Sequence, residues 1–266
     1  MVERRRKIAR EGGPVRYRAR VEYDGSDFAG FQLQAGVRTV QGELEAALGR
    51  LSGGTRVRVV AAGRTDAGVH ASGQVVVFGY DGRLAAPELE RALDAQLPPD
   101  VAVRDLRRVP RGFDPRRQAR HREYRYSIWN GPRSPLRERT ALGVRDPLDV
   151  AAMARAASAL VGRHDFRAFG AADGRDPIRT VHRIKVRRRG RSVTIDVVAD
   201  AFLRGMVRGI VAALMRVGRG ALAVEEVAAA LGETRRAFHG EVAPARGLFL
   251  RRVVYGRPGR RLNGER

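Results

Sequence analysis

The feature that most constrains the fold is an order of strands and helices that occurs twice along the 266 residues. Between Tyr17 and Val109 the sequence pattern predicts strand, helix, strand, strand, helix and strand, and the same order recurs between Arg122 and Tyr255. This order is typical of ferredoxin-like (RRM-like) units, in which helices cover one face of a largely antiparallel sheet. We therefore expect an α+β fold built from two β-α-β-β-α-β halves that meet at a central cleft.

Each predicted element rests on a local pattern. Strands are predicted where apolar and polar residues alternate or where β-branched residues form a run, and helices where an apolar stripe recurs every three to four residues. In the first half these are strands 17–23, 56–62, 73–78 and 101–109, a helix after Thr39 and a helix that begins near Pro87. In the second half they are strands 122–129, 181–187, 192–199 and 247–255, a helix that begins at Asp146-Pro147, a strongly apolar helix from Phe202 to Val217, and a short extra helix over 224–231.

The composition shift along the chain divides it into four parts. The ends are rich in charged residues and glycine without periodicity, which predicts a basic flexible arm over residues 1–14 and a basic flexible tail over 256–266. The polar, arginine-rich stretch 110–121 separates the halves. We place the N-terminal half at 15–115 and the C-terminal half at 116–255.

The net charge predicts a polyanionic partner. Lys and Arg number 52 and Asp and Glu 29, which gives +23 at pH 7. Such an excess indicates nucleic acid, although proteins that bind membrane surfaces or acidic proteins share the signature. We interpret the arginine clusters as a track that contacts phosphates. They comprise Arg116, Arg117, Arg120, Arg122, Arg187, Arg188, Arg189 and Arg191, of which Arg116 is a candidate substrate-binding residue.

Several classes of protein and site do not fit the sequence. The chain has no cysteine, which excludes disulfides, thiolate metal ligands and a cysteine nucleophile. No apolar run approaches the length of a membrane span, and the N-terminus lacks the apolar stretch of a signal peptide. We expect a soluble cytoplasmic protein with no membrane partner.

The loop 63–71 holds the best candidate for chemistry. Gly63 and Gly68 bracket an Arg-Thr-Asp core, and Asp66 is the acid within it. An aspartate in such a loop is commonly a turn residue. A catalytic carboxylate, however, needs a rigid support, which the apolar strands on both sides would provide. We interpret His70, at the head of the second strand, as structural.

Two further side chains are ambiguous from pattern alone. Arg208 lies within an apolar helix, where an unpaired charge is expensive to bury. It either extends to the surface or meets an acidic partner. Tyr124 alternates with polar residues in a strand, and periodicity alone favours packing in the core, as it does for Tyr126.

At this point a family resemblance is apparent. Residues 63–78, GRTDAGVHASGQVVVF, resemble the catalytic-aspartate motif of the TruA family of tRNA pseudouridine synthases. Further blocks resemble that family in the same order, so that the likeness runs from about Tyr17 to Tyr255; they are residues 22–26, 30–34, 39–45, 97–101, 122–126, 202–208 and 243–248.

The resemblance implies an isomerase that converts uridine to pseudouridine in the anticodon stem-loop of tRNA, at tRNA positions 38–40. It implies that Asp66 is the essential carboxylate and Arg208 its partner. Arg64 would fill the space left by the flipped base, and Tyr124 would stack on that base and help to remove the C5 proton. The resemblance also implies a homodimer whose two subunits are bridged by the RNA.

The reaction itself explains why these residue types are needed. The C1′–N1 bond of uridine breaks and the base rejoins the ribose through C5, so nothing is oxidised and neither a cofactor nor a metal is expected. The base must first be flipped out of the stacked RNA. A carboxylate near the ribose then acts either as a nucleophile at C1′ or as a base at C2′. The sequence leaves both roles open for Asp66.

Three departures from the family pattern bear on local loop geometry and RNA contacts. Gly209 replaces the usual Asn, Ala212 the usual Gly, and Asp114-Pro115 the usual His-Ala. Two other functions stay open. One is a non-catalytic RNA-binding protein of two RRM-like units, although no RNP motif is present and aromatic residues make up only 6%. The other is a pseudouridine synthase for a different RNA site.

Overall fold

The computed structural model describes residues 13–174, 176–231, 238 and 242–256. Nearly all of the arm predicted at 1–14 and of the tail predicted at 256–266 lies outside the described residues. The N-terminal half contains β1 (Val15–Tyr23), α1 (Val40–Leu51), β2 (Val60–Ala61), β3 (His70–Tyr80), α2 (Ala86–Gln96) and β4 (Val101–Arg108). The C-terminal half contains β5 (His121–Asn130), β6 (Leu142–Val144), α3 (Val150–Ala159), β7 (Gly162–Asp165), β8 (Ile178–Arg189), β9 (Ser192–Ala199), α4 (Met206–Gly218), α5 (Val224–Ala229) and β10 (Leu248–Val254).

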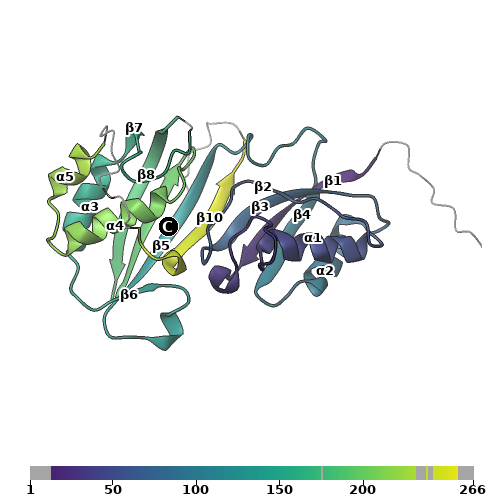
Figure 1. The fold of residues 1–266 in the computed structure, drawn as a ribbon, viewed down its shortest axis with the longest axis horizontal. Helices are drawn as coiled ribbons and strands as arrows, with labels where there is room; N and C mark the ends of the chain where they lie inside the picture. Colours follow the sequence, from purple (N-terminus) through teal and green to yellow (C-terminus); the bar gives the residue numbers. More distant parts are fainter. Residues whose placement is uncertain (1–12, 175, 232–237, 239–241, 257–266) are drawn as a thin grey trace, which may run out of the picture.

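The strands form one mixed, mostly antiparallel sheet in the order β4-β1-β3-β10-β5-β9-β8-β7, with β2 beside β3 and β6 beside β5 (Figure 1). If the strands of each predicted unit are numbered one to four, both halves show the order 4-1-3-2. In the first half it is β4-β1-β3-β2, and in the second β10-β5-β9-β8. The predicted α+β fold of two ferredoxin-like halves is therefore confirmed.

The halves are joined more closely than expected, because β10 merges their sheets into one. β10 is antiparallel to β5 and parallel to β3, where Phe249 pairs with His70 and Leu250 with Ala71. β2 pairs only with Val76 and Val77, farther along the same edge of β3. A short β2 thus leaves the start of that edge free for β10.

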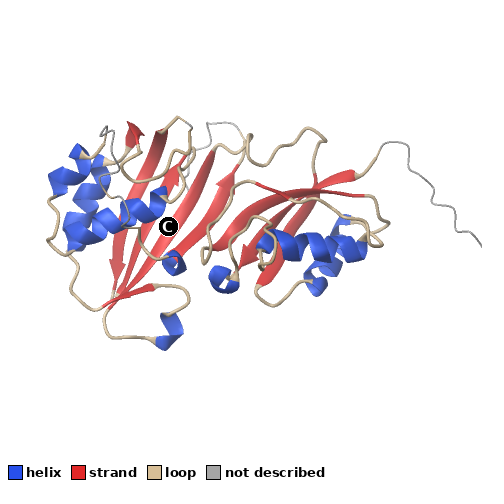
Figure 2. Cartoon of the chain, in the orientation of Figure 1, coloured by secondary structure: helices blue, strands red, loops and turns tan. Residues whose placement is uncertain are grey.

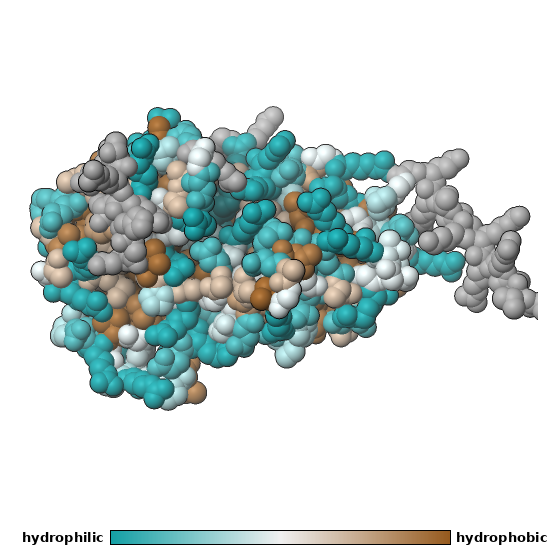
Figure 3. All heavy atoms as spheres, in the orientation of Figure 1, coloured by the Kyte–Doolittle hydropathy of each residue, from teal (hydrophilic) through white to brown (hydrophobic). Residues whose placement is uncertain are grey.

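Both groups of helices cover the same face of this sheet. Partners across a ladder project to the same side, and one row of paired residues runs through both halves. The row consists of Tyr23, Ala71, Leu250, Tyr124 and Val197. Figure 2 shows α1 and α2 at one end of the sheet and α3, α4 and α5 at the other. Under each group lies a separate hydrophobic core. The surface in Figure 3 is mostly hydrophilic, with small apolar patches.

Three predicted elements begin four residues later than expected. The strand expected over 56–62 is reduced to Val60–Ala61, because the N–H of Val59 bonds the buried carboxylate of Glu45 instead of a neighbouring strand. The helix expected from Asp146 begins at Val150, capped by the Asp149 side chain. The helix expected from Phe202 begins at Met206, after Gly205 in the left-handed region at φ 73°.

The short strands β6 and β7 were not predicted, because three or four residues carry too little periodicity. Within the described part of the chain, no helix combines the length and the apolarity needed to cross a membrane.

Candidate active site

Residues 62–69 connect β2 to β3 and present Asp66 on the helix-covered face. Several anchors hold this loop. The side-chain amide of Gln74 donates to the carbonyl of Gly63 at 2.9 Å, and the hydroxyls of Tyr23 and Thr65 hydrogen-bond at 2.8 Å. Gln74, Tyr23 and Thr65 are all buried. Thr65, the residue before Asp66, is therefore held in place by a buried side chain, as a carboxylate of defined orientation requires.

Arg208 approaches Asp66 from the other half. It lies in the first turn of α4, and its Nη1 is 3.6 Å from Asp66 Oδ2. Its Nε donates to the carbonyl of Ala243 at 2.6 Å, and this bond fixes the orientation of the guanidinium. The Arg208 side chain is 20% exposed and that of Asp66 43%. Of the two interpretations of Arg208, the structure shows the one with an acidic neighbour.

Tyr124 stands on the central strand β5 beside these two residues. Its ring packs edge-on against Phe202, with centroids 5.0 Å apart. Burial raises the pKa of the Tyr124 phenol to about 12; the nearby Arg122 opposes the rise and Asp66 adds to it. At neutral pH Tyr124 is therefore an uncharged phenol, able to donate or accept a hydrogen bond.

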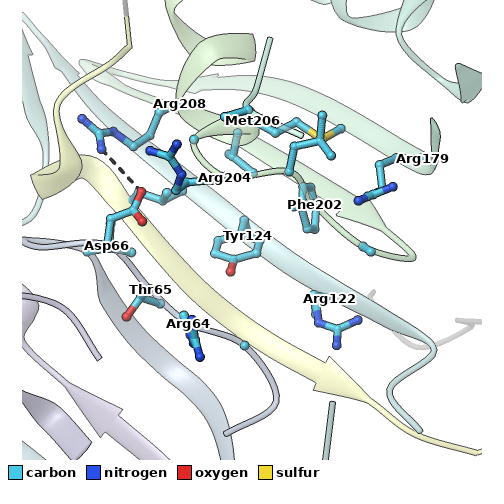
Figure 4. Close-up of a pocket in the computed structure, with 18 of the residues that line it drawn as sticks. Arg64, Thr65, Asp66, Arg122, Tyr124, Arg179, Phe202, Arg204, Met206 and Arg208 are labelled. Atoms are coloured by element: carbon cyan, nitrogen blue, oxygen red, sulfur yellow. Dashed lines mark ion pairs between the residues drawn. The ribbon is translucent and has the colours of Figure 1, made fainter. Parts of the chain in front are cut away.

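A cleft of about 310 Å³ brings the predicted residues together (Figure 4). Residues from both halves line it, and they include all five candidates: Arg64, Asp66, Arg116, Tyr124 and Arg208. In the sequence these residues are spread over 145 positions, from 64 to 208. Their roles stay predictions, but their common location follows from the joined sheet.

Arg64 and Arg116 are the exposed members of this set. Arg64 lies two residues before Asp66 in the loop. Arg116 is in the connector between the halves, where its N–H and that of Arg117 both donate to Asp114 Oδ1 at 2.8 Å. The departure Asp114-Pro115 thus forms a turn that orients the arginines after it, and the pKa of Asp114 is lowered chiefly by the N–H of Arg117.

The predicted phosphate track needs one correction. Arg122 is only partly exposed, and its guanidinium is hydrogen-bonded to backbone carbonyls, so it is not a free phosphate ligand. The other predicted members are exposed, but Arg188 Nη2 also bonds Asn130 Oδ1 at 2.8 Å and the carbonyl of Leu148 at 3.1 Å. Arg187, Arg188, Arg189 and Arg191 lie around the β8–β9 turn and do not line the cleft.

Sequence reasoning missed several residues of the cleft. Phe202 was assigned to a helix stripe, although it lies before α4 and packs on Tyr124. Arg204 lines the cleft and forms a two-bonded ion pair with Asp173, both bonds at 2.9 Å. Arg179 also faces the cleft. The block 202–208 already contained the signal for Phe202 and Arg204, whereas nothing in the sequence marked Asp173.

His70 is structural, as predicted. It is buried, it accepts from the N–H of Gly25 through Nδ1 at 3.1 Å, and its Nε2 lies 3.1 Å from the carbonyl of Arg246. Gly209, a departure from the family pattern, is required by packing, since a Cβ there would collide with the carbonyl of Phe169.

The described residues contain no group of three or more His, Asp or Glu side chains arranged to hold a metal ion. The cleft instead offers a carboxylate beside a cation, a neutral phenol next to an aromatic ring, and exposed arginines at its rim. This set can act as a nucleophile or base and can hold an anionic ligand.

Comparison with known proteins points to one family. The family described as tRNA pseudouridine synthase matches residues 19–116 and 156–256. The chain is 45% identical to tRNA pseudouridine synthase A of Moorella thermoacetica over 239 residues, covering 88% of this chain and 96% of that protein. It is 43% identical to the protein of that name from Myxococcus xanthus over 255 residues (94% and 96%), and 42% identical to that of Halalkalibacterium halodurans over 233 residues (86% and 89%).

Proposed function

The chain belongs to the tRNA pseudouridine synthase family and is an isomerase that acts on tRNA, and from this premise we propose that its target uridines lie in the anticodon stem-loop, with Asp66 as the essential carboxylate. The observation that carries the proposal is the position of Asp66. It lies in a cleft between the halves, 3.6 Å from Arg208 and beside Tyr124.

The chemistry divides among three groups. Asp66 either attacks C1′ or removes the C2′ proton, and the C1′–N1 bond breaks. The base then rejoins C1′ through C5. If Asp66 attacked C1′, its bond to C1′ breaks as C5 bonds there; if Asp66 removed the C2′ proton, that proton returns to C2′. The C5 proton then leaves, while N1 gains a proton. Arg208 holds the carboxylate and stabilises its charge. Tyr124 stacks on the flipped base, and its neutral phenol relays the C5 proton: it gives up its own proton to solvent as it accepts the one from C5.

Arg64 and Arg116 bind the RNA around the flipped nucleotide. Both are arginines exposed at the cleft, with several N–H donors each and no acceptor. Arg64 would occupy the space that the base leaves, and Arg116 would contact a phosphate. A dissociation constant for tRNA that rises steeply with salt is the expected sign of such contacts.

The decisive experiment is Asp66→Asn, assayed by tritium release from C5-labelled uridine in tRNA. The variant should bind tRNA nearly as well as wild type but lose more than about 1,000-fold in turnover. Asp173→Asn is the matched control, because among the described residues Asp173 is the other carboxylate that lines the cleft. Appreciable turnover by Asp66→Asn would reject the assignment. If the wild-type protein binds tRNA but shows no turnover, a non-catalytic RNA-binding protein is favoured.

Mapping pseudouridine across cellular tRNA with and without the protein tests the target site. Loss of the modification at positions 38–40 is expected, and loss at another site would point to a different specificity.

We also expect a homodimer and a cytoplasmic location. These two expectations rest on the family resemblance and on the tRNA substrate. Sedimentation that detects only a fully active monomer at micromolar concentration would reject the dimer.

A further inference from the structure

Arg122 forms a connection between three separate segments of the chain. It lies at the second position of β5, and its guanidinium donates three hydrogen bonds to main-chain carbonyls. Nη1 bonds the carbonyl of Asp200 at 2.8 Å, while Nη2 bonds those of Ala62 at 3.0 Å and Arg116 at 2.9 Å. The acceptors are 78, 60 and 6 residues away in the sequence.

Each acceptor belongs to a segment that forms part of the cleft. Ala62 is the residue that begins the 62–69 loop, four positions before Asp66. Asp200 follows β9 and precedes Phe202, the ring that packs on Tyr124. Arg116 lies in the connector between the halves and lines the cleft itself. Figure 4 shows Arg122 along the strand from Tyr124, on the side of the cleft away from the Asp66–Arg208 pair.

The chemistry of this contact requires arginine. The guanidinium is a planar fork whose donors diverge in fixed directions, so one side chain can bond acceptors on different segments at once. A lysine ammonium is a point charge on a flexible stem and cannot reproduce this fixed set of bonds. The three bonds also go to carbonyls rather than to carboxylates, and the partial burial of this cation lowers the pKa of Arg122.

We propose that Arg122 is a positioning residue for the isomerisation, because it fixes the separation between the Asp66 loop and the Tyr124–Phe202 wall. The inference rests on the proposed function of the cleft. Asp66 must reach the ribose while Tyr124 lies against the base of the same nucleotide, so the width of the cleft sets whether both contacts form together. A misplacement of about 1 Å can cost about 100-fold in rate.

The test compares Arg122→Met and Arg122→Lys with Arg50→Met in the full chain. Arg50 is a suitable control, because its guanidinium also bonds a carbonyl, that of Gln96 at 2.8 Å, but it joins α1 to the end of α2 away from the cleft. We expect Arg122→Met to lower kcat about 100-fold while KM for tRNA stays within about threefold. Arg122→Lys should recover little of this loss, and Arg50→Met should behave as wild type.

Hydrogen exchange distinguishes positioning from a general loss of stability. In Arg122→Met the amides of residues 62–69 and 200–205 should exchange faster, while those of α1 and α4 keep their protection. Faster exchange throughout both cores, a kcat within threefold of wild type, or a raised KM with unchanged kcat would each overturn the inference. Should Arg122→Met fail to fold, Arg122→Lys gives the same comparison.

Parallel assays of wild type and Asp66→Asn separate this inference from the proposed function. If wild type forms no pseudouridine, the proposed function fails, and the inference fails with it. If wild type is active, Asp66→Asn is inactive and the Arg122 variants match wild type, the proposed function stands and only the positioning role is rejected.

Discussion

The two halves share one topology but differ at equivalent connections. In the C-terminal half, the twelve-residue β8 leads into β9 through Gly190 and Arg191 alone. In the N-terminal half, β2 has two residues, and the eight residues 62–69 separate it from β3. The first half therefore has a loop where the second has a tight hairpin, and that loop carries Asp66.

This difference shows how a duplicated fold can build an asymmetric site. The C-terminal half contributes Tyr124 and Arg208 from a strand and a helix, whose backbone hydrogen bonds already fix the main chain at both residues. The N-terminal half contributes the carboxylate from a loop without a ladder, so side chains such as Gln74 and Tyr23 must anchor it. Catalysis should thus depend on regular structure in one half and on individual side-chain contacts in the other.

Among the variants that test this comparison, the largest effect is expected at the contact between the halves. Arg208→Leu should lower kcat by about 100-fold or more, because Asp66 loses its neighbouring cation and the hydrogen bond from residue 208 to the carbonyl of Ala243 is lost. Arg208→Lys keeps the charge but lacks the Nε bond, so its kcat should lie between those of wild type and Arg208→Leu. Arg155→Leu, an exposed arginine on α3, is the control. Tritium release under saturating tRNA measures all three, and equal rates for Arg208→Leu and Arg155→Leu would contradict a catalytic role for Arg208.

The second prediction concerns the seam where β10 joins β3. A Cβ on Gly73 would collide with the carbonyl of Arg251, so Gly73→Ala should push the two strands apart. We expect a loss of about 1–3 kcal/mol in the free energy of unfolding. Gly143→Ala in β6 has open space around it and should change stability little. Urea denaturation measures both, and similar midpoints would mean that the seam adapts without cost.

The fold and the site were predictable to different depths. Two kinds of local pattern located most elements and their duplicated order: alternation of apolar and polar residues, as in residues 17–23, and apolar stripes, as in α4. The family motifs located Asp66, Tyr124 and Arg208, which local periodicity alone could not, since it assigned Tyr124 to the core. The parallel pairing of β10 with β3 was not predictable, because register between distant strands leaves no local pattern. The role of Arg122 was misread for a similar reason, since three carbonyl contacts from distant segments leave no sequence signal.

A smaller effect is expected from removing one anchor of the Asp66 loop. Tyr23→Phe deletes the hydroxyl that bonds Thr65, and the partner hydroxyl is left in a buried position. We expect a stability loss of about 1 kcal/mol and, because the loop loosens, a kcat lower by roughly tenfold. Tyr80→Phe is the control, since Tyr80 bonds the backbone of Leu84 in the same half and does not line the cleft. A kcat reduced equally in both variants would show that the loop needs no specific anchor.

The smallest expected effect lies at the rim, where the connector between the halves presents Arg116. Asp114 holds this turn through the N–H groups of Arg116 and Arg117, and the former of these arginines lines the cleft. Asp114→Ala should release the turn and weaken tRNA binding by about two- to threefold through less ordered phosphate contacts.

Removing an acid also makes the chain more basic, which by itself strengthens RNA binding. Asp81→Ala therefore serves as the control, because it removes an exposed acid of the same charge away from the cleft. The pH dependence has a defined sign. The pKa of Asp114 is lowered, so its stabilisation of the turn is present above the ordinary aspartate range and is lost as pH falls through the lowered value. The affinity ratio of wild type to Asp114→Ala should thus stay constant from pH 8 to about pH 5. A ratio that collapses within that window would show that another titrating group orders the connector.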